Sequence, residues 1–251
     1  MHVRLFWQPT GRLDADLHSF LHIYTPGQKR SWAVTQNMNP GGIPTSSWLP
    51  SLYYVDDLRV TAPEDRPPAS FTLAESLADV GGGPLFVPDS EDGLIYLGEI
   101  GFQPLKAGWR QRVQAQTATP ARFGEELTLQ GYDLLAAPGG PILRLFWAPT
   151  RTPAADYTLF VHLYAPDGTR IAQYDGPPLA GLVPTSGWQP EGLYIDRRVL
   201  PLPGDLTGGT YTFQVGLYRA DTGERLPIFP EPQVAGHFSG DALLVPLVIP
   251  E

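Results

Sequence analysis

The chain has 251 residues, of which 42% are hydrophobic and 17% charged, and its formal net charge is −9. This composition is typical of globular proteins, and the length suffices for two ordinary domains. The acidic balance and the lack of any run of Lys and Arg exclude binding to a phosphate backbone, so we expect no nucleic-acid partner.

The absence of cysteine excludes disulfides, thiolate metal ligands and cysteine nucleophiles. No stretch approaches the roughly 18 apolar residues of a membrane helix. The first residues, Met1 to Trp7, lack the basic and apolar regions of a signal peptide. We therefore expect no direct membrane span in this chain.

The first half of the chain contains four segments that return in the second half with a constant offset of 140 residues. They are RLFWQPT at 4–10, FLHIYTP at 20–26, PTSSWLP at 44–50 and YVD at 54–56, matched by RLFWAPT, FVHLYAP, PTSGWQP and YID. Four matches in one register indicate an internal duplication. The segments LIYLGEI at 94–100 and LLVPLVI at 243–249 are expected to be the closing strands of the two copies.

Residues 103–124 are the least apolar segment between the copies, and a short strand within it is compatible with its composition. We place the domain boundary near residue 110, which gives a first repeat at 1–109 and a second at 110–251.

The second copy has an element for which the first has no counterpart. The segment ELTLQGYDLLAAPGG at 126–140 combines apolar alternation with a Pro-Gly-Gly turn, which predicts a strand and a turn. In the first copy this strand would precede residue 1. Either the natural chain starts further upstream, or the first domain has lost its opening strand. Proteins usually cover a free strand edge, so we expect another segment or a strand-exchange partner to cover this one.

Short runs rich in β-branched and aromatic residues follow in the second copy, separated by turn residues such as Asp167-Gly168 and Asp221-Thr222-Gly223. No segment has the capped i, i+3, i+4 spacing of a helix. We count about eight strands. The predicted fold class is therefore all-β, with two tandem jelly-roll or immunoglobulin-like β-sandwich domains. Runs that are apolar on both faces, such as FVHLY, are expected to be central strands covered by a loop or by the neighbouring module.

Three segments of the second copy resemble a bacterial domain type. They are FVHLYAPDGTRIAQYDGPP at 160–178, PTSGWQP at 184–190, and the run from LYIDRRVL to GERLP at 193–227. The chain resembles the soluble C-terminal β-sandwich modules of multi-spanning glycosyltransferases of the dolichyl-phosphate-mannose mannosyltransferase type and of related envelope proteins. The resemblance covers residues 123–249, and more faintly 3–100. It implies an extracytoplasmic location and glycan contact, and it implies no catalytic role.

Aromatic residues in and near the loop that carries PTSGWQP at 184–190, and PTSSWLP at 44–50 in the first copy, are candidates for ligand binding. Trp188 and Trp48 are flanked by prolines, with Tyr194 and Tyr54 nearby. In a sugar-binding site the indole would stack on a pyranose ring. We favour the alternative, in which the indole closes one end of the sandwich, because large aromatic side chains mostly serve burial.

Polar residues of the second copy form the other candidate cluster: His162, Asp175, Asp196 and Arg197. Histidine side chains ordinarily titrate near neutral pH, so one reading of His162 and its counterpart His22 is a ligand or an acid–base group. A hydrogen-bonded, half-buried histidine is the reading we favour. For the carboxylates we favour a salt bridge that holds the loop to a strand.

Several polar positions differ between the copies. The first has Thr35 where the second has Asp175, Gly27-Gln28 where it has Asp167-Gly168, and Asp57 where it has Arg197. These differences argue against a shared catalytic duty. Metal-binding motifs are absent from the sequence, so we expect no metal and no cofactor.

The function we expect is a non-enzymatic extracytoplasmic accessory or interaction module of the cell envelope, with a glycan or another envelope protein as partner. One alternative is a carbohydrate-binding module that uses the Trp188 loop. Another is a structural subunit of a surface layer or filament. A hydrolase would need two carboxylates in a cleft. The available residues, Glu125, Glu126, Glu191 and Glu224, lie at predicted turns or strand ends.

Overall fold

The computed structural model describes residues 1–25, 31–61, 65–80, 90, 92–105 and 113–250. Within these ranges the protein is all-β, with antiparallel pairing throughout, and its helices are 3₁₀ turns of three to six residues. The all-β class predicted from the sequence is confirmed. No helix in the described ranges is long and apolar enough to cross a membrane.

Contacts divide the chain into two compact units. Unit 1 comprises residues 1–63 and 69–102, and unit 2 comprises residues 64–68 and 103–251. The predicted boundary, near residue 110, lies in a segment outside the described residues. Leu105 already belongs to unit 2, because its carbonyl accepts a hydrogen bond from Leu193 N–H at 3.0 Å.

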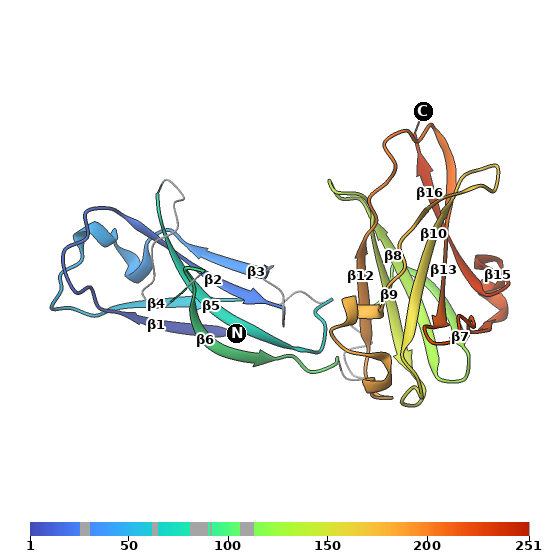
Figure 1. Ribbon diagram of the computed structural model, residues 1–251, viewed down its shortest axis with the longest axis horizontal. Helices are drawn as coiled ribbons and strands as arrows, with labels where there is room; N and C mark the ends of the chain where they lie inside the picture. The colour runs from blue at the N-terminus through green and yellow to red at the C-terminus, as the bar shows by residue number, and fades with distance from the viewer. Residues whose placement is uncertain (26–30, 62–64, 81–89, 91, 106–112, 251) are drawn as a thin grey trace. The chain divides into compact units, whose positions relative to one another are not determined.

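Unit 1 contains a two-stranded and a four-stranded sheet (Figure 1). Its strands are β1 (His2–Trp7), β2 (Leu17–Tyr24), β3 (Ser31–Asn37), β4 (Tyr54–Arg59), β5 (Ser70–Asp79) and β6 (Ile95–Gly101). The sheet orders are β1-β4 and β3-β2-β5-β6. Buried apolar side chains on β2 and β5, among them Leu21, Ile23 and Phe71, form the interior.

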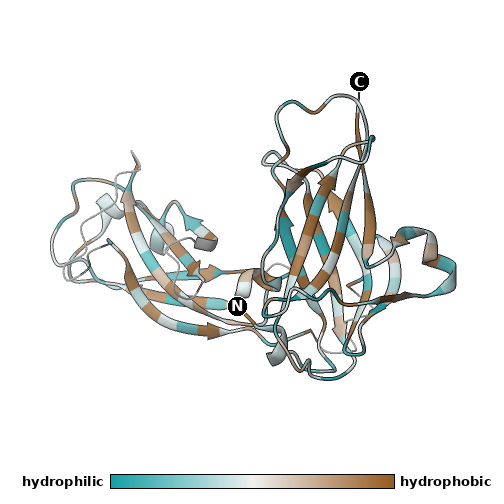
Figure 2. Ribbon diagram, turned by 45° about the vertical axis from the view of Figure 1, so that its right-hand side comes forward, coloured by the Kyte–Doolittle hydropathy of each residue, from teal (hydrophilic) through white to brown (hydrophobic). Residues whose placement is uncertain are grey.

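Unit 2 contains two five-stranded sheets, ordered β12-β9-β8-β7-β14 and β11-β10-β13-β16-β15. The strands are β7 (Thr117–Phe123), β8 (Leu127–Leu135), β9 (Ile142–Pro149), β10 (Tyr157–Tyr164), β11 (Arg170–Gln173), β12 (Tyr194–Val199), β13 (Gly209–Arg219), β14 (Ile228–Pro230), β15 (Phe238–Ser239) and β16 (Ala242–Ile249). Hydrophobic and hydrophilic residues alternate along several of these strands (Figure 2). The inward residues from both sheets, including Phe123, Trp147 and Phe213, form one core.

Corresponding strands of the two units pair in the same register. In unit 1, Phe6 is opposite Val55 and Trp7 is opposite Tyr54; in unit 2 the pairs are Phe146 with Ile195 and Trp147 with Tyr194. The pairing of β2 with β5 likewise repeats in β10 and β13, and that of β5 with β6 repeats in β13 and β16. The two predicted closing strands, β6 and β16, therefore occupy corresponding positions.

The hairpin of β7 and β8 belongs to unit 2. β8 is the predicted strand at 126–140, and it pairs with β9 along its length. β7 lies within the segment for which a short strand was compatible with the sequence. In the described part of unit 1, β1 pairs with β4 and with no other strand.

The predicted turn at Asp167-Gly168 connects β10 to β11. Gly168 has a φ of +85°, a conformation that favours glycine. Thr169 N–H donates to the Asp167 carboxylate at 2.9 Å, which closes the turn. β10 is a central strand, as predicted for FVHLY, and the Arg225 guanidinium lies over the outward-facing Phe160 ring at 4.2 Å from its centroid.

Candidate functional site

Trp188 and Trp48 lie in corresponding loops and are packed in the same way. Trp188 stacks on Tyr194 and Trp48 stacks on Tyr54, in both cases with ring centroids 4.4 Å apart and ring planes 3° from parallel. Only 1% of Trp188 is exposed. Its indole N–H donates to the Val183 carbonyl at 3.1 Å. One face of each indole is thus covered by a tyrosine.

The loops that carry these tryptophans are anchored by matching hydrogen bonds. In each loop a threonine hydroxyl accepts a hydrogen bond from a backbone N–H and donates one to a backbone carbonyl. An aspartate carboxylate accepts a hydrogen bond from the N–H that follows the threonine, and the tyrosine hydroxyl accepts one from the N–H that follows the tryptophan. The donor–acceptor distances agree to within 0.2 Å between Thr45, Asp16 and Tyr54 in unit 1 and Thr185, Asp156 and Tyr194 in unit 2. The residues that match between the copies therefore hold the loop on the sandwich.

This packing bears on the sugar-binding hypothesis. Stacking on a pyranose needs an indole face open to solvent, and the buried Trp188 offers none in this conformation. Trp188 is packed as expected of an indole that closes one end of the sandwich, which is the role that the sequence favoured. Exposed aromatic surface lies elsewhere, at Tyr53 and Phe6 of unit 1.

His162 lies on β10 and contacts Asp175, which follows β11. Its Nε2 is 3.1 Å from the carboxylate. Burial lowers the pKa of His162, and the Asp175 charge opposes this effect in part. His22, the counterpart in unit 1, instead has the Ser76 hydroxyl 2.9 Å from its Nε2. Both histidines are buried or half-buried and hydrogen-bonded, and their partners differ.

Asp196 and Arg197 do not join His162 in one cluster. Asp196 lies on β12, in the other sheet, and accepts hydrogen bonds from Arg198 Nε at 2.7 Å and from Leu179 N–H at 2.5 Å. Arg197 is exposed, and its Nε is 3.5 Å from the Asp65 carboxylate. Neighbouring residues on a strand point to opposite faces, so only one of the two arginines can reach Asp196. The predicted cluster of four is corrected accordingly.

Arg198 performs the anchoring that was expected of Arg197. Besides Asp196, it donates to the carbonyls of Gly176 and Pro177 at 2.9 and 2.8 Å. The ion pair lies within β12, and the loop is held to the strand by hydrogen bonds from Arg198 to the Gly176 and Pro177 carbonyls and from Leu179 N–H to Asp196.

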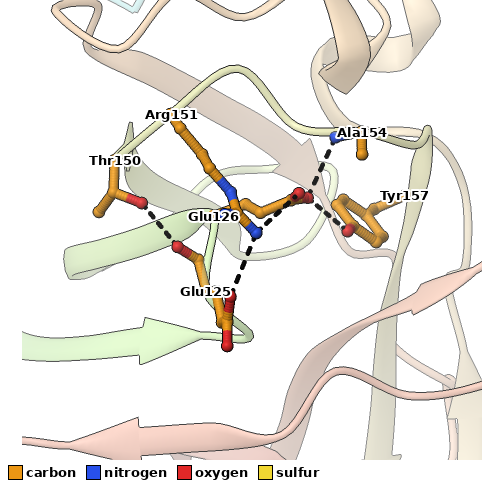
Figure 3. A network of polar contacts seen from close by, with 6 residues as sticks. All are labelled: Glu125, Glu126, Thr150, Arg151, Ala154 and Tyr157. Atoms are coloured by element: carbon orange, nitrogen blue, oxygen red, sulfur yellow. Dashed lines mark hydrogen bonds and ion pairs between the residues drawn. The ribbon is translucent and has the colours of Figure 1, made fainter.

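Glu126 belongs to a second polar network of unit 2 (Figure 3). One carboxylate oxygen accepts hydrogen bonds from Tyr157 at 2.7 Å and from Ala154 N–H at 3.2 Å, while Arg151 lies 3.4 Å from the other oxygen. Burial and the Glu126 hydrogen bond raise the pKa of Tyr157 to about 12. Glu125, also considered as a hydrolase carboxylate, forms an exposed pair with Arg151. These contacts fix the turn before β8.

Unit 1 buries an acidic cluster that the sequence did not reveal. The Ser19 hydroxyl is 2.7 Å from Glu75 and 3.2 Å from Asp56, and Asn37 donates to Asp56 at 2.6 Å. Burial raises the pKa of Glu75 to about 7. The corresponding residues of unit 2 for Ser19 and Glu75 are Leu159 and Val215. The signal for this cluster in the sequence was that two polar residues of the first copy stand where the second copy has apolar ones. In the described ranges, no group of three potential ligands is arranged to hold a metal.

The outward side of β1 and β4 is the most distinctive surface of unit 1. Phe6, Tyr53 and Val55 are 65%, 67% and 46% exposed. Their counterparts Phe146, Leu193 and Ile195 are 1%, 2% and 4% exposed, because Leu105 and Val113 pack over them. We call Phe6, Tyr53 and Val55 the uncovered face.

No family model and no curated protein matches the chain. Among solved structures it is similar to the β-glucuronidase of Bacteroides uniformis, with 12% identity and a TM-score of 0.28, over 90% of this chain and 25% of that one. It is also similar to the β-glucuronidase of Ruminococcus gnavus in complex with uronic isofagomine, with 11% identity and a TM-score of 0.20, over 92% and 33%. The chain spans a quarter to a third of these enzymes, and TM-scores this low assign neither a fold nor an activity.

Proposed function

We propose that the chain is a non-enzymatic interaction module of the cell envelope, built from two duplicated jelly-roll sandwiches and located outside the cytoplasm. The observation that carries the proposal is the uncovered face. A cluster of exposed large apolar side chains typically marks a contact surface. Phe6, Tyr53 and Val55 are exposed where an identically placed set in unit 2 is buried.

The polar residues that match between the units support the non-enzymatic part of the proposal. Thr185 forms hydrogen bonds with the backbone of Ala155 and Tyr157, and Asp156 and Tyr194 accept hydrogen bonds from backbone N–H groups of the loop. Their counterparts in unit 1 do the same. Retention of these residues is thus accounted for by folding. The resemblance to glycosyltransferase-associated modules supports the extracytoplasmic location.

Photo-crosslinking in intact cells tests this function. A photoreactive phenylalanine analogue at position 6 should link the chain to an envelope protein, and external protease should degrade the product. The same analogue at Val248, which is exposed on β16, is the matched control and should give no such product. Equal yields at both positions, no product at position 6, or a product confined to the cytoplasm would contradict the proposal. A position-6 product with a glycan instead would favour the carbohydrate-binding alternative.

A further inference from the structure

A polar bridge crosses the interior of unit 1 from one sheet to the other. It consists of Asp56 on β4, in the two-stranded sheet, and of Ser19 on β2 and Glu75 on β5, in the four-stranded sheet. The Ser19 hydroxyl contacts both carboxyl groups, and each of the three residues is at most 2% exposed. The bridge therefore joins the two sheets through groups that are closed off from solvent.

The polar bridge needs a proton beyond the one that serine supplies. A serine hydroxyl has a single proton to donate. Ser19 Oγ is 2.7 Å from Glu75 Oε1 and 3.2 Å from Asp56 Oδ2, so both contacts are full hydrogen bonds only when one of the acids is protonated. Burial raises the pKa of Glu75 to about 7, which makes Glu75 the protonated acid. Glu75 then donates to Ser19, and Ser19 donates to Asp56.

The surroundings of the two acids provide no positive charge in the described part of unit 1. The side chains directly opposite Glu75 and Asp56 on neighbouring strands are apolar: Leu21, Ile95 and Leu5. Asn37 of β3 donates to Asp56 at 2.6 Å and is neutral. The other ionisable residues of these strands lie on the outward sides or, like Asp79, at a strand end. Asp56 is the charge that acts on Glu75.

Unit 2 keeps the aspartate of the bridge and balances it differently. Asp196, at the position of Asp56, pairs with Arg198 on its own strand at 2.7 Å. In unit 1 the position of this arginine is held by the buried Leu58. The serine and the glutamate of the bridge are replaced in unit 2 by the core residues Leu159 and Val215. Only unit 1 therefore places two acids on facing sheets without a cation between them in the described residues.

We propose that the polar bridge is a pH-sensitive link between the two sheets of unit 1, closed by one shared proton and released when this proton is lost. Ionised Glu75 leaves one contact of Ser19 without a hydrogen bond, and it faces the charge of Asp56 on the opposite sheet in an apolar surround, where like charges repel. The ribbon of β1 and β4 then separates from the four-stranded sheet.

The link regulates the uncovered face, and this consequence rests on the proposed function. Phe6 lies on β1 and Val55 on β4, so the ribbon that separates is the one that carries these side chains. An isolated two-stranded ribbon is marginally stable in water. The uncovered face is thus held in shape below neutral pH and loses its support above it.

Proton linkage gives the sign and the size of the effect. Glu75 has a pKa of about 7 when the sheets are together, and solvation in the separated state returns it to the ordinary 4.5. Between these values the closed form keeps a proton that the separated form has lost, so the equilibrium constant for separation rises about tenfold per pH unit. It is constant below pH 4.5 and above pH 7.

Hydrogen exchange on the full chain between pH 5 and 8, corrected for intrinsic rates, tests the proposal. The opening constant of β4 amides should rise about tenfold per pH unit up to pH 7 and then level off. At each pH it should exceed that of β5 amides at least tenfold, because β4 is released while the four-stranded sheet stays together. The matched control within the same molecule is β12, the counterpart of β4, whose amides should show no such slope.

Two variants test whether the bridge is responsible. Glu75→Gln cannot ionise and can donate to Ser19, so its β4 amides should lose the pH slope and stay as protected as those of the unaltered chain at pH 5. Ser19→Ala removes the hydroxyl between the two acids and should raise the β4 opening constant at pH 5 by about tenfold. If one variant does not fold, the other decides.

A flat β4 profile, equal opening constants for β4 and β5, or a slope that persists in Glu75→Gln would overturn the inference. Crosslinking at position 6 separates this failure from that of the proposed function. Its yield in intact cells should fall between external pH 5.5 and pH 8, and should not fall in the Glu75→Gln chain. An equal yield at both pH values would remove the regulation and leave the proposed function standing.

Discussion

Glu75 is a carboxylate buried in the sheet of unit 1, close to a second acid. Its Oε1 is hydrogen-bonded to Ser19 at 2.7 Å, and its Oε2 is buried. Burial penalises the charged form and Asp56 adds repulsion, so the pKa rises from 4.5 to about 7. The corresponding position of unit 2 is Val215, a core residue. We therefore expect Glu75 to make the stability of unit 1 depend on pH.

The stability of unit 1 should fall as pH rises from about 4.5 to about 7 and then level off. Below the unfolded pKa both states are protonated; above it the unfolded state loses its proton first, which favours unfolding. The rise of the pKa from 4.5 to about 7 limits the loss to at most about 3 kcal/mol. Hydrogen exchange of β5 amides, corrected for intrinsic rates, measures it.

Glu75→Gln keeps an acceptor for Ser19 and should abolish the dependence, while β13 amides in the same experiment serve as the internal control. An unchanged pH slope in the variant would refute this role of Glu75.

At the scale of elements, β8 fixes β9 through strand pairing and a buried ion pair. Asp133 is fully buried and is bonded to Arg144 and to Gln116 N–H at 2.5 Å. Gly131, also on β8, has a φ of +159°, and a Cβ there would lie 2.3 Å from the Thr117 carbonyl oxygen, so the close approach of β7 requires glycine. In unit 1, Arg4 pairs with Asp57 across β4 at 2.8 Å instead, with both groups largely exposed.

Asp133→Ala should destabilise unit 2 by about 3–5 kcal/mol, because it leaves the Arg144 guanidinium without its buried partner. Urea denaturation is the measurement. The matched control is Asp57→Ala, which breaks the equivalent but exposed pair with Arg4 and should cost less than about 1 kcal/mol. Similar losses in the two variants would show that burial does not distinguish these ion pairs.

At the scale of the whole molecule, the two units differ in completeness. Unit 2 closes its core between two five-stranded sheets, whereas one sheet of unit 1 has two strands in the described residues. An isolated two-stranded ribbon is marginally stable in water. Unit 1 therefore depends more heavily on its four-stranded sheet.

Residues 103–251 expressed alone should unfold in one cooperative transition. Residues 1–102 expressed alone should melt at a Tm lower by about 10 °C or more, since a loss of 1 kcal/mol shifts the Tm of a domain of this size by about 4–8 °C. Circular dichroism on both fragments makes the comparison. A higher Tm for 1–102 would contradict the unequal completeness of the units.

The sequence by itself determined the all-β class, the matched strands and the turn at Asp167-Gly168, because alternation and turn chemistry act over a few residues. It also placed Tyr194 near the loop that carries Trp188. Strand alternation alone puts Asp196 and Arg198 on one face of β12, but the sequence could not show that this face meets the loop at Gly176 and Pro177.

The tertiary structure alone decided which surfaces are covered. Phe6 and Phe146 lie in the nearly identical segments RLFWQPT and RLFWAPT, yet one is 65% exposed and the other 1%. Burial of an outward-facing strand residue depends on a segment remote along the chain, here Leu105 and Val113 over β9 and β12. Local sequence carries no record of that neighbour, so the uncovered face of unit 1 emerged only from the folded molecule.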